Sequence, residues 1–344
     1  MKKIITITIL ILVSVFVYSQ NTITGTFLGL NNQQIKLIGF NGFNTYVIDS
    51  VQANEKGEFK LAYSITDYGM GYLSAADNKP YFIVLSATDI KLIGETFILP
   101  ETIKILEGVE NQLFAQYATE HPRREQTLSA WVYLEKIYTL DSLFAVQEDP
   151  KQAIAKEKQR ITTEDSLFLA ELPEKSYVSY YLPLRKLVSS VSTIAQYRTE
   201  EIPATIASFR KIDYKDTRLQ KSGLLGNVIE SHFWLIENSG RSLDSVYIEM
   251  QISIDRMLEN LLTDETKLNE ITEHLFKFLE QRSLFPASEY LAIKLLNEKS
   301  CTINNYFAAQ LESYRAMKKG NIAPDFDFKK YIITTDYKDN LVSL

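Results

Sequence analysis

Few side chains in this chain have a type and spacing suited to catalysis. The single cysteine, Cys301, lies in the run Lys299-Ser300-Cys301-Thr302. A dithiol exchange cycle needs an attacking thiolate and a second thiol that resolves the mixed disulfide, and one cysteine cannot supply both. We therefore interpret Cys301 as a small buried or half-buried residue in a break between two helices. An intermolecular disulfide and a sulfenic acid sensor are the alternatives.

The three histidines, His121, His232 and His274, are not spaced to share a metal ion. Two imidazoles on one helical face need the pattern His-Glu-x-x-His, which is missing around each of them. We predict that each histidine is a surface or capping residue, and the sequence implies no metal and no small-molecule cofactor. There is also no Gly-x-Ser-x-Gly turn and no glycine-rich phosphate loop, so we predict no catalytic residue.

One group of aromatic residues could bind a ligand. Tyr177, Tyr180 and Tyr181 come shortly before Arg185, and Trp131 lies on an earlier helical stretch. Aromatic rings with a nearby cation can bind a sugar or a peptide. Their helical spacing favours packing in a core as the competing interpretation. If this region binds a ligand, these five residues are the predicted surface.

Residues 20–107 have the period of two that is typical of short strands. Ile23, Gly25 and Phe27 alternate with polar threonines, and Ile35 and Leu37 alternate across a lysine. Runs rich in Asn, Asp and Gly separate these stretches. Several short strands at this spacing predict a small antiparallel β-sandwich or barrel.

Residues 108–319 have the period of helices instead. Leu128, Trp131, Leu134 and Tyr138 recur three or four residues apart, and similar stripes follow from Val246 and from Ile271. The pattern predicts an all-helical domain. Breaks are predicted near Pro122, Asp149-Pro150, Pro173, Pro203, Ser239-Gly240 and Ser300. A last helix, about 304–319, is predicted to end where lysines precede Gly320.

The segment after this helix is the most informative part of the chain. Gly320 is followed by Ala323-Pro324-Asp325-Phe326 entering an extended run. This arrangement resembles the opening of a thioredoxin-like domain of the TlpA or peroxiredoxin-related (AhpC/TSA) kind. The resemblance implies a disulfide reductase whose Trp-Cys-x-x-Cys motif would follow a few tens of residues later. Residues 320–344 are expected to be only the first strands of that domain, because ordinary domains need at least about 50 residues.

Features between residues 20 and 117 also resemble the β-rich domain of unknown function that precedes thioredoxin-like domains in exported proteins. Asp49-Ser50-Val51 followed by Gly57-Glu58-Phe59-Lys60 is similar to its hairpin. Ile103-Lys104-Ile105 is similar to its closing strand, and Gly108-Val109-Glu110-Asn111 to its passage into the next helix. The order of these features, rather than any one residue, carries the resemblance.

The N-terminus predicts export. Lys2 and Lys3 precede an apolar stretch from Ile4 to Val17, and we interpret Met1–Ser19 as a cleaved signal peptide. An uncleaved membrane anchor is the alternative, but the stretch is shorter than the roughly 20 residues of a spanning helix. The residue at the cleavage point is Gln20 and not a cysteine, so the chain is not expected to be a lipoprotein. We expect it in the periplasm or cell envelope.

Composition is that of a globular protein, with 45% hydrophobic and 23% charged residues. The net charge of −6 disfavours binding to nucleic acid. The sequence thus predicts an α+β multidomain chain: a signal peptide (1–19), a β-rich accessory domain (20–107), a helical domain (108–319) and the truncated start of a thioredoxin-like domain (320–344).

The function implied by the resemblance is that of an accessory region, for positioning or substrate recognition, in an exported thiol:disulfide oxidoreductase. The expected partners are envelope proteins with disulfides or a membrane redox partner. A stand-alone exported binding protein without catalysis is the alternative. An enzyme whose site no motif reveals ranks last.

Overall fold

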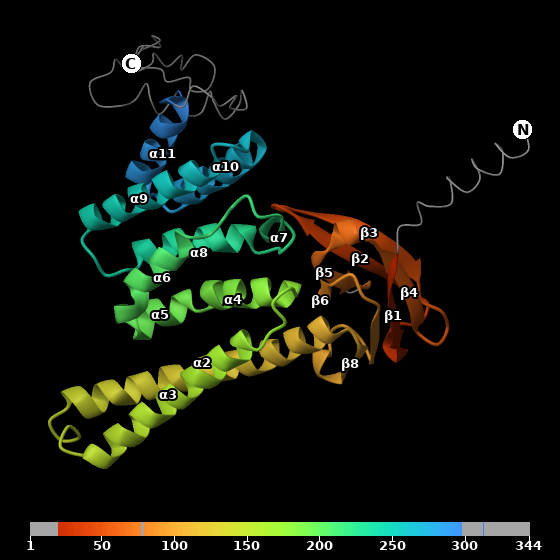
Figure 1. The fold of residues 1–344 in the computed structure, drawn as a ribbon, viewed down its shortest axis with the longest axis horizontal. Helices are drawn as coiled ribbons and strands as arrows, with labels where there is room; N and C mark the ends of the chain where they lie inside the picture. The colour runs from red at the N-terminus through yellow and green to blue at the C-terminus, as the bar shows by residue number, and fades with distance from the viewer. Residues whose placement is uncertain (1–19, 77–78, 298–311, 313–344) are drawn as a thin grey trace, which may run out of the picture. The chain divides into compact units, whose positions relative to one another are not determined.

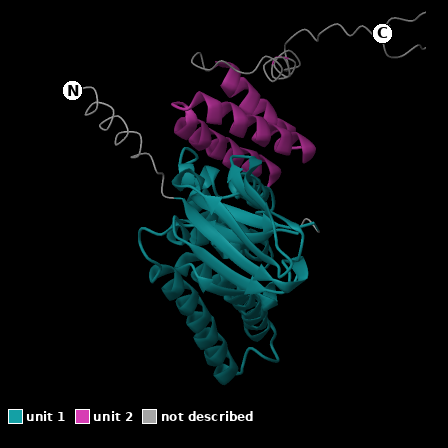
Figure 2. Cartoon of the chain, turned by 90° about the vertical axis from the view of Figure 1, so that its right-hand side faces the viewer, with its two compact units in different colours: residues 1–241 teal, residues 242–344 magenta. Residues whose placement is uncertain are grey.

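The computed structural model describes residues 20–76, 79–297 and 312. It confirms the α+β class, with β-sheets in the N-terminal part followed by helices (Figure 1). The chain divides into two compact units, residues 1–241 and 242–344 (Figure 2). Several predictions lie outside the described residues: the signal peptide, the helix at 304–319, Cys301, and the motif residues Gly320, Ala323, Pro324, Asp325 and Phe326.

Among the described residues of the first unit, eight strands form two four-stranded sheets. One sheet has the order β4-β1-β7-β8 and the other β3-β2-β5-β6. Neighbouring strands are antiparallel except β1 and β7, which pair in parallel. The strands are β1 (Asn21–Phe27), β2 (Gln34–Asn41), β3 (Asn44–Gln52), β4 (Glu58–Tyr63), β5 (Gly69–Ser74), β6 (Tyr81–Leu85), β7 (Ile90–Gly94) and β8 (Lys104–Glu107). Short 3-10 helices connect some of them: η1 (Leu28–Leu30), η2 (Ile65–Asp67) and η3 (Pro100–Thr102).

The predicted alternation determines what the two sheets bury. In β1, Ile23 and Phe27 are fully buried, while the threonines between them are partly exposed. Leu37 of β2 and Leu61 of β4 join them in one core, which therefore takes residues from both sheets. Packing requires a glycine at position 25, because a Cβ there would lie 2.2 Å from the ring of Phe59. Each large aliphatic side chain buried in this way contributes about 1.5–3 kcal/mol.

Helices follow the sheets in the first unit. Figure 1 shows α2 and α3 side by side as a long hairpin, and the two helices are in contact. The helices of this unit are α2 (Val109–Leu140), α3 (Glu148–Ala170), α4 (Tyr177–Ser189), α5 (Val191–Tyr197), α6 (Ile202–Phe209), α7 (Thr217–Gln220) and α8 (Leu225–Glu237), with the 3-10 helix η4 (Thr199–Glu201) between α5 and α6. None of the described helices is long and apolar enough to cross a membrane.

The predicted break at Pro122 is wrong, because α2 continues through it. Proline removes one backbone donor and destabilises a helix interior. Buried residues lie on both sides of it, Tyr117 before and Leu128 and Val132 after. Burial against α3 and the following helices offsets the cost of the proline, which sequence alone does not reveal.

The second unit contains α9 (Leu243–Leu261), α10 (Glu265–Gln281) and α11 (Phe285–Asn297). The predicted apolar stripes are confirmed here, since Met250, Ile271 and Leu275 are buried. Side chains cap two of the helices: Ser242 accepts a hydrogen bond from the backbone of Ser245, and Asp264 from that of Lys267. Such N-caps satisfy backbone donors that a helix leaves open at its start.

The junction between sheets and helices in the first unit is specified by the passage that the sequence singled out. The Asn111 amide donates to the Val84 carbonyl and accepts from the Val84 N–H, both at 2.8 Å. It therefore acts as a short strand partner for β6. Beside it, the Glu110 carboxylate accepts from the backbone N–H of Val178 at 3.0 Å. These bonds fix the start of α2 against both β6 and α4.

Candidate functional site

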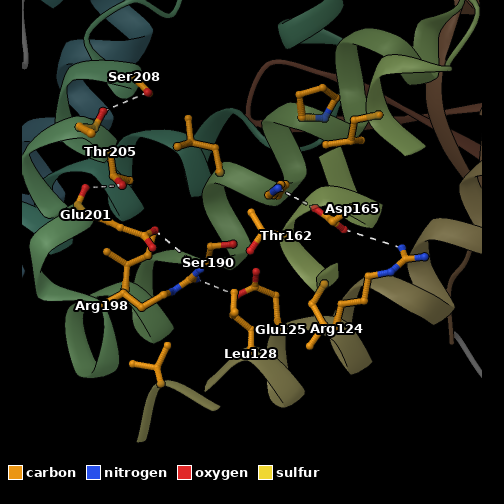
Figure 3. Close-up of a pocket in the computed structure, with 18 of the residues that line it drawn as sticks. Arg124, Glu125, Leu128, Thr162, Asp165, Ser190, Arg198, Glu201, Thr205 and Ser208 are labelled. Carbon is orange, nitrogen blue, oxygen red and sulfur yellow. Dashed lines mark hydrogen bonds and ion pairs between the residues drawn. The ribbon is translucent and has the colours of Figure 1, made fainter. Parts of the chain in front are cut away.

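A pocket of about 750 Å³ lies among the helices of the first unit (Figure 3). Its wall is built by α2, α3, α4, α5 and α6, together with η4. It is partly open to solvent, and its lining is predominantly apolar. The fixed junction at Asn111 orients α2, which supplies one side of the wall.

Aliphatic side chains from several helices form the apolar part of the lining. Leu128 and Val132 lie four residues apart on α2 and thus on the same face. They are joined by Ile161 of α3, Leu184 of α4 and Ile194 of α5. The lining contains no aromatic ring, histidine or cysteine.

Arg198 connects distant parts of the wall. Its side chain is 9% exposed, and its Nη2 donates to Glu125 Oε2 at 2.8 Å. Its Nη1 lies 3.7 Å from Glu201 Oε2, which is beyond hydrogen-bond distance. Figure 3 shows the arginine between the carboxylates of Glu125 and Glu201. Partial burial raises the pKa of Glu201, and the charge of Arg198 opposes that shift. Glu125 and Arg198 form a largely buried pair, so removing one partner would leave an uncompensated charge.

A second polar network surrounds Asp165, whose side chain is 7% exposed. Its Oδ1 accepts from His121 Nδ1 at 2.9 Å, and its Oδ2 accepts from Lys186 Nζ at 2.6 Å. Burial alone would raise the pKa of the Asp165 carboxyl, but the bonds from His121 and Lys186 outweigh burial and lower this pKa to about 2. Asp165 is therefore a structural carboxylate that stays ionised.

Three buried polar atoms on residues of the wall have no hydrogen-bond partner among the described residues: Arg124 Nη1, Ser190 Oγ and Arg198 Nε. Ser190 lies between α4 and α5, and its hydroxyl makes no capping bond. A buried donor without a partner costs about 1–3 kcal/mol. In a pocket wall, the arginine N–H groups can donate hydrogen bonds to water or a ligand, and the Ser190 hydroxyl can donate or accept one.

The polar groups that line the pocket are suited to bind a ligand. The hydroxyl of Thr205 donates to the backbone carbonyl of Glu201 at 2.9 Å, and the hydroxyl of Ser208 donates to that of Ala204 at 3.0 Å. His121 is the nearest imidazole in the network, but its Nε2 is buried and has no partner in the described chain. The hydroxyls of Thr205 and Ser208 are therefore bonded to backbone carbonyls and not to a side-chain base. Across the described residues, no group of three or more His, Cys, Asp or Glu side chains could hold a metal ion.

The prediction that His121 and His232 are surface or capping residues is wrong. They are 6% and 1% exposed, respectively. His121 pairs with an aspartate 44 residues further along the chain, which local spacing cannot reveal. His232 packs between the rings of Phe209 and Phe233, each 5.1 Å away, and burial lowers its pKa to about 3, with the charge of Arg210 acting in the same direction.

The five residues that the sequence named as a possible binding surface do not line the pocket. Tyr177 and Tyr181 are buried in a core that joins helices and sheet. Tyr180 lies under the guanidinium of Arg218, 4.2 Å from ring centre to Cζ. Arg185 lies 5.2 Å from the ring centre of Phe114, and Trp131 is partly exposed on α2.

Sequence reasoning missed the pocket residues because the lining comes from helices far apart in the chain. One signal was present in α3. Asp165 follows Ile161 by four residues, which places an acid on the stripe that Ile154 and Ile161 bury. An acid on an apolar stripe indicates a buried partner, here from α2 and α4.

Comparisons with family models, with curated proteins and with solved structures return no match to this chain.

Proposed function

We propose that this chain is the substrate-recognition region of an exported thiol:disulfide oxidoreductase, contributing binding rather than redox chemistry. The observation that carries the recognition role is the pocket among α2–α6, which combines an aliphatic lining with unpartnered buried donors. The redox part of the proposal rests on the resemblance of Ala323-Pro324-Asp325-Phe326 to the opening of a thioredoxin-like domain. On this proposal, residues 20–107 and 108–319 are the accessory domains and 320–344 begin the catalytic one.

The arrangement of the first unit supports a recognition role. The sheets and the helices that wall the pocket share a core around Tyr117 and Tyr177. Backbone bonds add to this, as Gly42 N–H donates to Gln220 and Met70 N–H to Lys221. A pocket in such a firmly held wall loses little conformational entropy when a ligand binds.

A stand-alone exported binding protein is the second candidate. The same pocket favours it, because ligand binding there requires no redox partner. The two candidates differ only in what the gene encodes after Leu344.

Reading the coding DNA beyond the codon for Leu344 tests the redox part directly. A Cys-x-x-Cys in frame, or one base out of frame, supports the oxidoreductase. Its whole product should then reduce insulin with a thiol reductant, whereas a variant with both motif cysteines replaced by serine should not. Unrelated sequence would contradict the redox assignment and favour the stand-alone binding protein.

A further inference from the structure

We propose that the pocket among α2–α6 binds a short, uncharged, aliphatic segment of polypeptide. The proposal deepens the recognition role above and rests on it only in taking this pocket as the binding site. It is argued from the charge balance of the wall, its unpartnered hydrogen-bonding groups, and its shape and lining.

The charges of the wall balance one another. Its basic residues are Arg124, Lys158, Lys186 and Arg198, and its acidic residues are Glu125, Asp165, Glu200 and Glu201. The deeper acids are already paired, Glu125 with Arg198 and Asp165 with Lys186. A charged ligand would have to separate one of these pairs or bury its own charge without a partner, and both are costly. An uncharged ligand avoids this penalty.

The hydrogen-bonding groups that remain fit an amide, which both donates and accepts, better than a group that only donates or only accepts. Arg198 Nε and Arg124 Nη1 are N–H donors that make no hydrogen bond among the residues described, although Arg124 Nη1 lies 3.8 Å from Asp165 Oδ1 as an ion pair. Both are suited to donate to carbonyl oxygens. Ser190 Oγ can donate or accept. Glu201 offers a carboxylate on the same wall, 3.7 Å from its arginine, that can accept an N–H. A peptide unit brings one acceptor and one donor and no net charge.

The residues that line the pocket determine which side chains the bound peptide segment can have. Leu128, Val132, Ile161 and Ile194 present only aliphatic carbon. Nucleobases are commonly held by stacking on aromatic rings, and the described residues of this wall include none. The volume of about 750 Å³ lies within the roughly 300–1,000 Å³ of ligand pockets. Aliphatic side chains of a few residues would therefore fill it.

Isothermal titration calorimetry on the mature chain tests the proposal, with acetyl-Ala-Leu-Val-Ala-amide as the probe. Two analogues of the same sequence serve as comparisons, one with a free C-terminal carboxylate and one with N-methylated peptide bonds. We expect saturable binding of the capped peptide and at least tenfold weaker binding of each analogue. The carboxylate adds an unpaired charge, and N-methylation removes the N–H donors.

Two substitutions on α6 provide a matched pair. Ala204 lines the pocket and Ala207 does not, and both are exposed on the same helix. Ala204→Phe should fill the space and weaken binding at least tenfold, while Ala207→Phe should leave the affinity unchanged. Thermal melts of both variants show whether the fold is retained.

Ser190→Ala keeps the proposal testable if Ala204→Phe fails to fold. The Ser190 hydroxyl makes no capping bond, so the free energy of unfolding should not fall in this variant. Peptide affinity should fall about 2- to 12-fold, as for the loss of one hydrogen bond.

Four outcomes would overturn the proposal: no saturable binding at millimolar peptide, equal or tighter binding of the carboxylate analogue, equal binding of the N-methylated peptide, or equal loss in Ala204→Phe and Ala207→Phe. None of these results bears on the redox assignment, which the coding DNA after Leu344 decides separately.

Discussion

At Asp165 a single carboxylate connects three helices. It lies on α3 and accepts hydrogen bonds from His121 on α2 and from Lys186 on α4. A buried ion that is paired on several sides loses stability sharply when one member is removed. This residue therefore holds the deep side of the pocket wall together.

We predict that Asp165→Asn lowers the free energy of unfolding by about 2 kcal/mol, since the pKa shift of its carboxyl to about 2 corresponds to a loss of that order. Urea denaturation measures the change. Glu164→Gln is the matched control, because its side chain is 46% exposed and pairs only on the surface with Arg160. The control should change stability by less than about 0.5 kcal/mol. Equal effects of the two substitutions would contradict a buried role for Asp165.

The same carboxyl predicts how stability depends on pH. Its pKa is lowered in the folded state, from an ordinary value of 3.8 to about 2. Its contribution is therefore complete above the unfolded-state pKa and is lost as pH falls through the folded-state pKa. The stability difference between wild type and Asp165→Asn should be constant at neutral pH and shrink between about pH 4 and pH 2. Urea midpoints measured across that range test this, and a difference that persists at pH 2 would be inconsistent with it.

At the scale of elements, the sequence predicted what local periodicity determines and missed what distant contacts determine. The strand alternation at Ile23 and Phe27 and the stripe through Met250 are local patterns, and both are confirmed. The continuation of α2 through Pro122 depends on packing against other helices, and the sequence predicted a break there. The pocket depends on five helices meeting, and one of its charge pairs, Glu125 with Arg198, joins residues 73 apart in the chain.

The joint between β6 and α2 gives a prediction at this scale. Asn111→Ala should destabilise the first unit by about 3 kcal/mol, because it leaves the buried N–H and C=O of Val84 without partners. Gln116→Ala on the same helix is the control, since Gln116 is exposed and bonds only to Glu120. Hydrogen exchange adds a local readout: the Val84 amide should lose protection in the alanine variant and keep it in the control. Unchanged protection at Val84 would mean that the joint does not depend on Asn111.

At the scale of the whole molecule, the chain divides into two compact units, and the residues that line the pocket belong to the first. The net charge of −6 is spread over a chain whose pocket wall is balanced in charge. Binding in the pocket is therefore expected to depend little on salt, because no net charge is neutralised there.

We predict that the chain of residues 20–344 has no disulfide reductase activity of its own. It contains one cysteine, and catalysis of this kind needs a low-pKa attacking thiol together with a second thiol that releases the mixed disulfide. Insulin reduction with a thiol reductant, compared with the reductant alone, measures the activity of the wild type and of Cys301→Ser. Both should match the background. Turnover that survives Cys301→Ser would reveal a catalytic site among other residues, and turnover lost in that variant would show that Cys301 takes part in exchange with a thiol from another molecule.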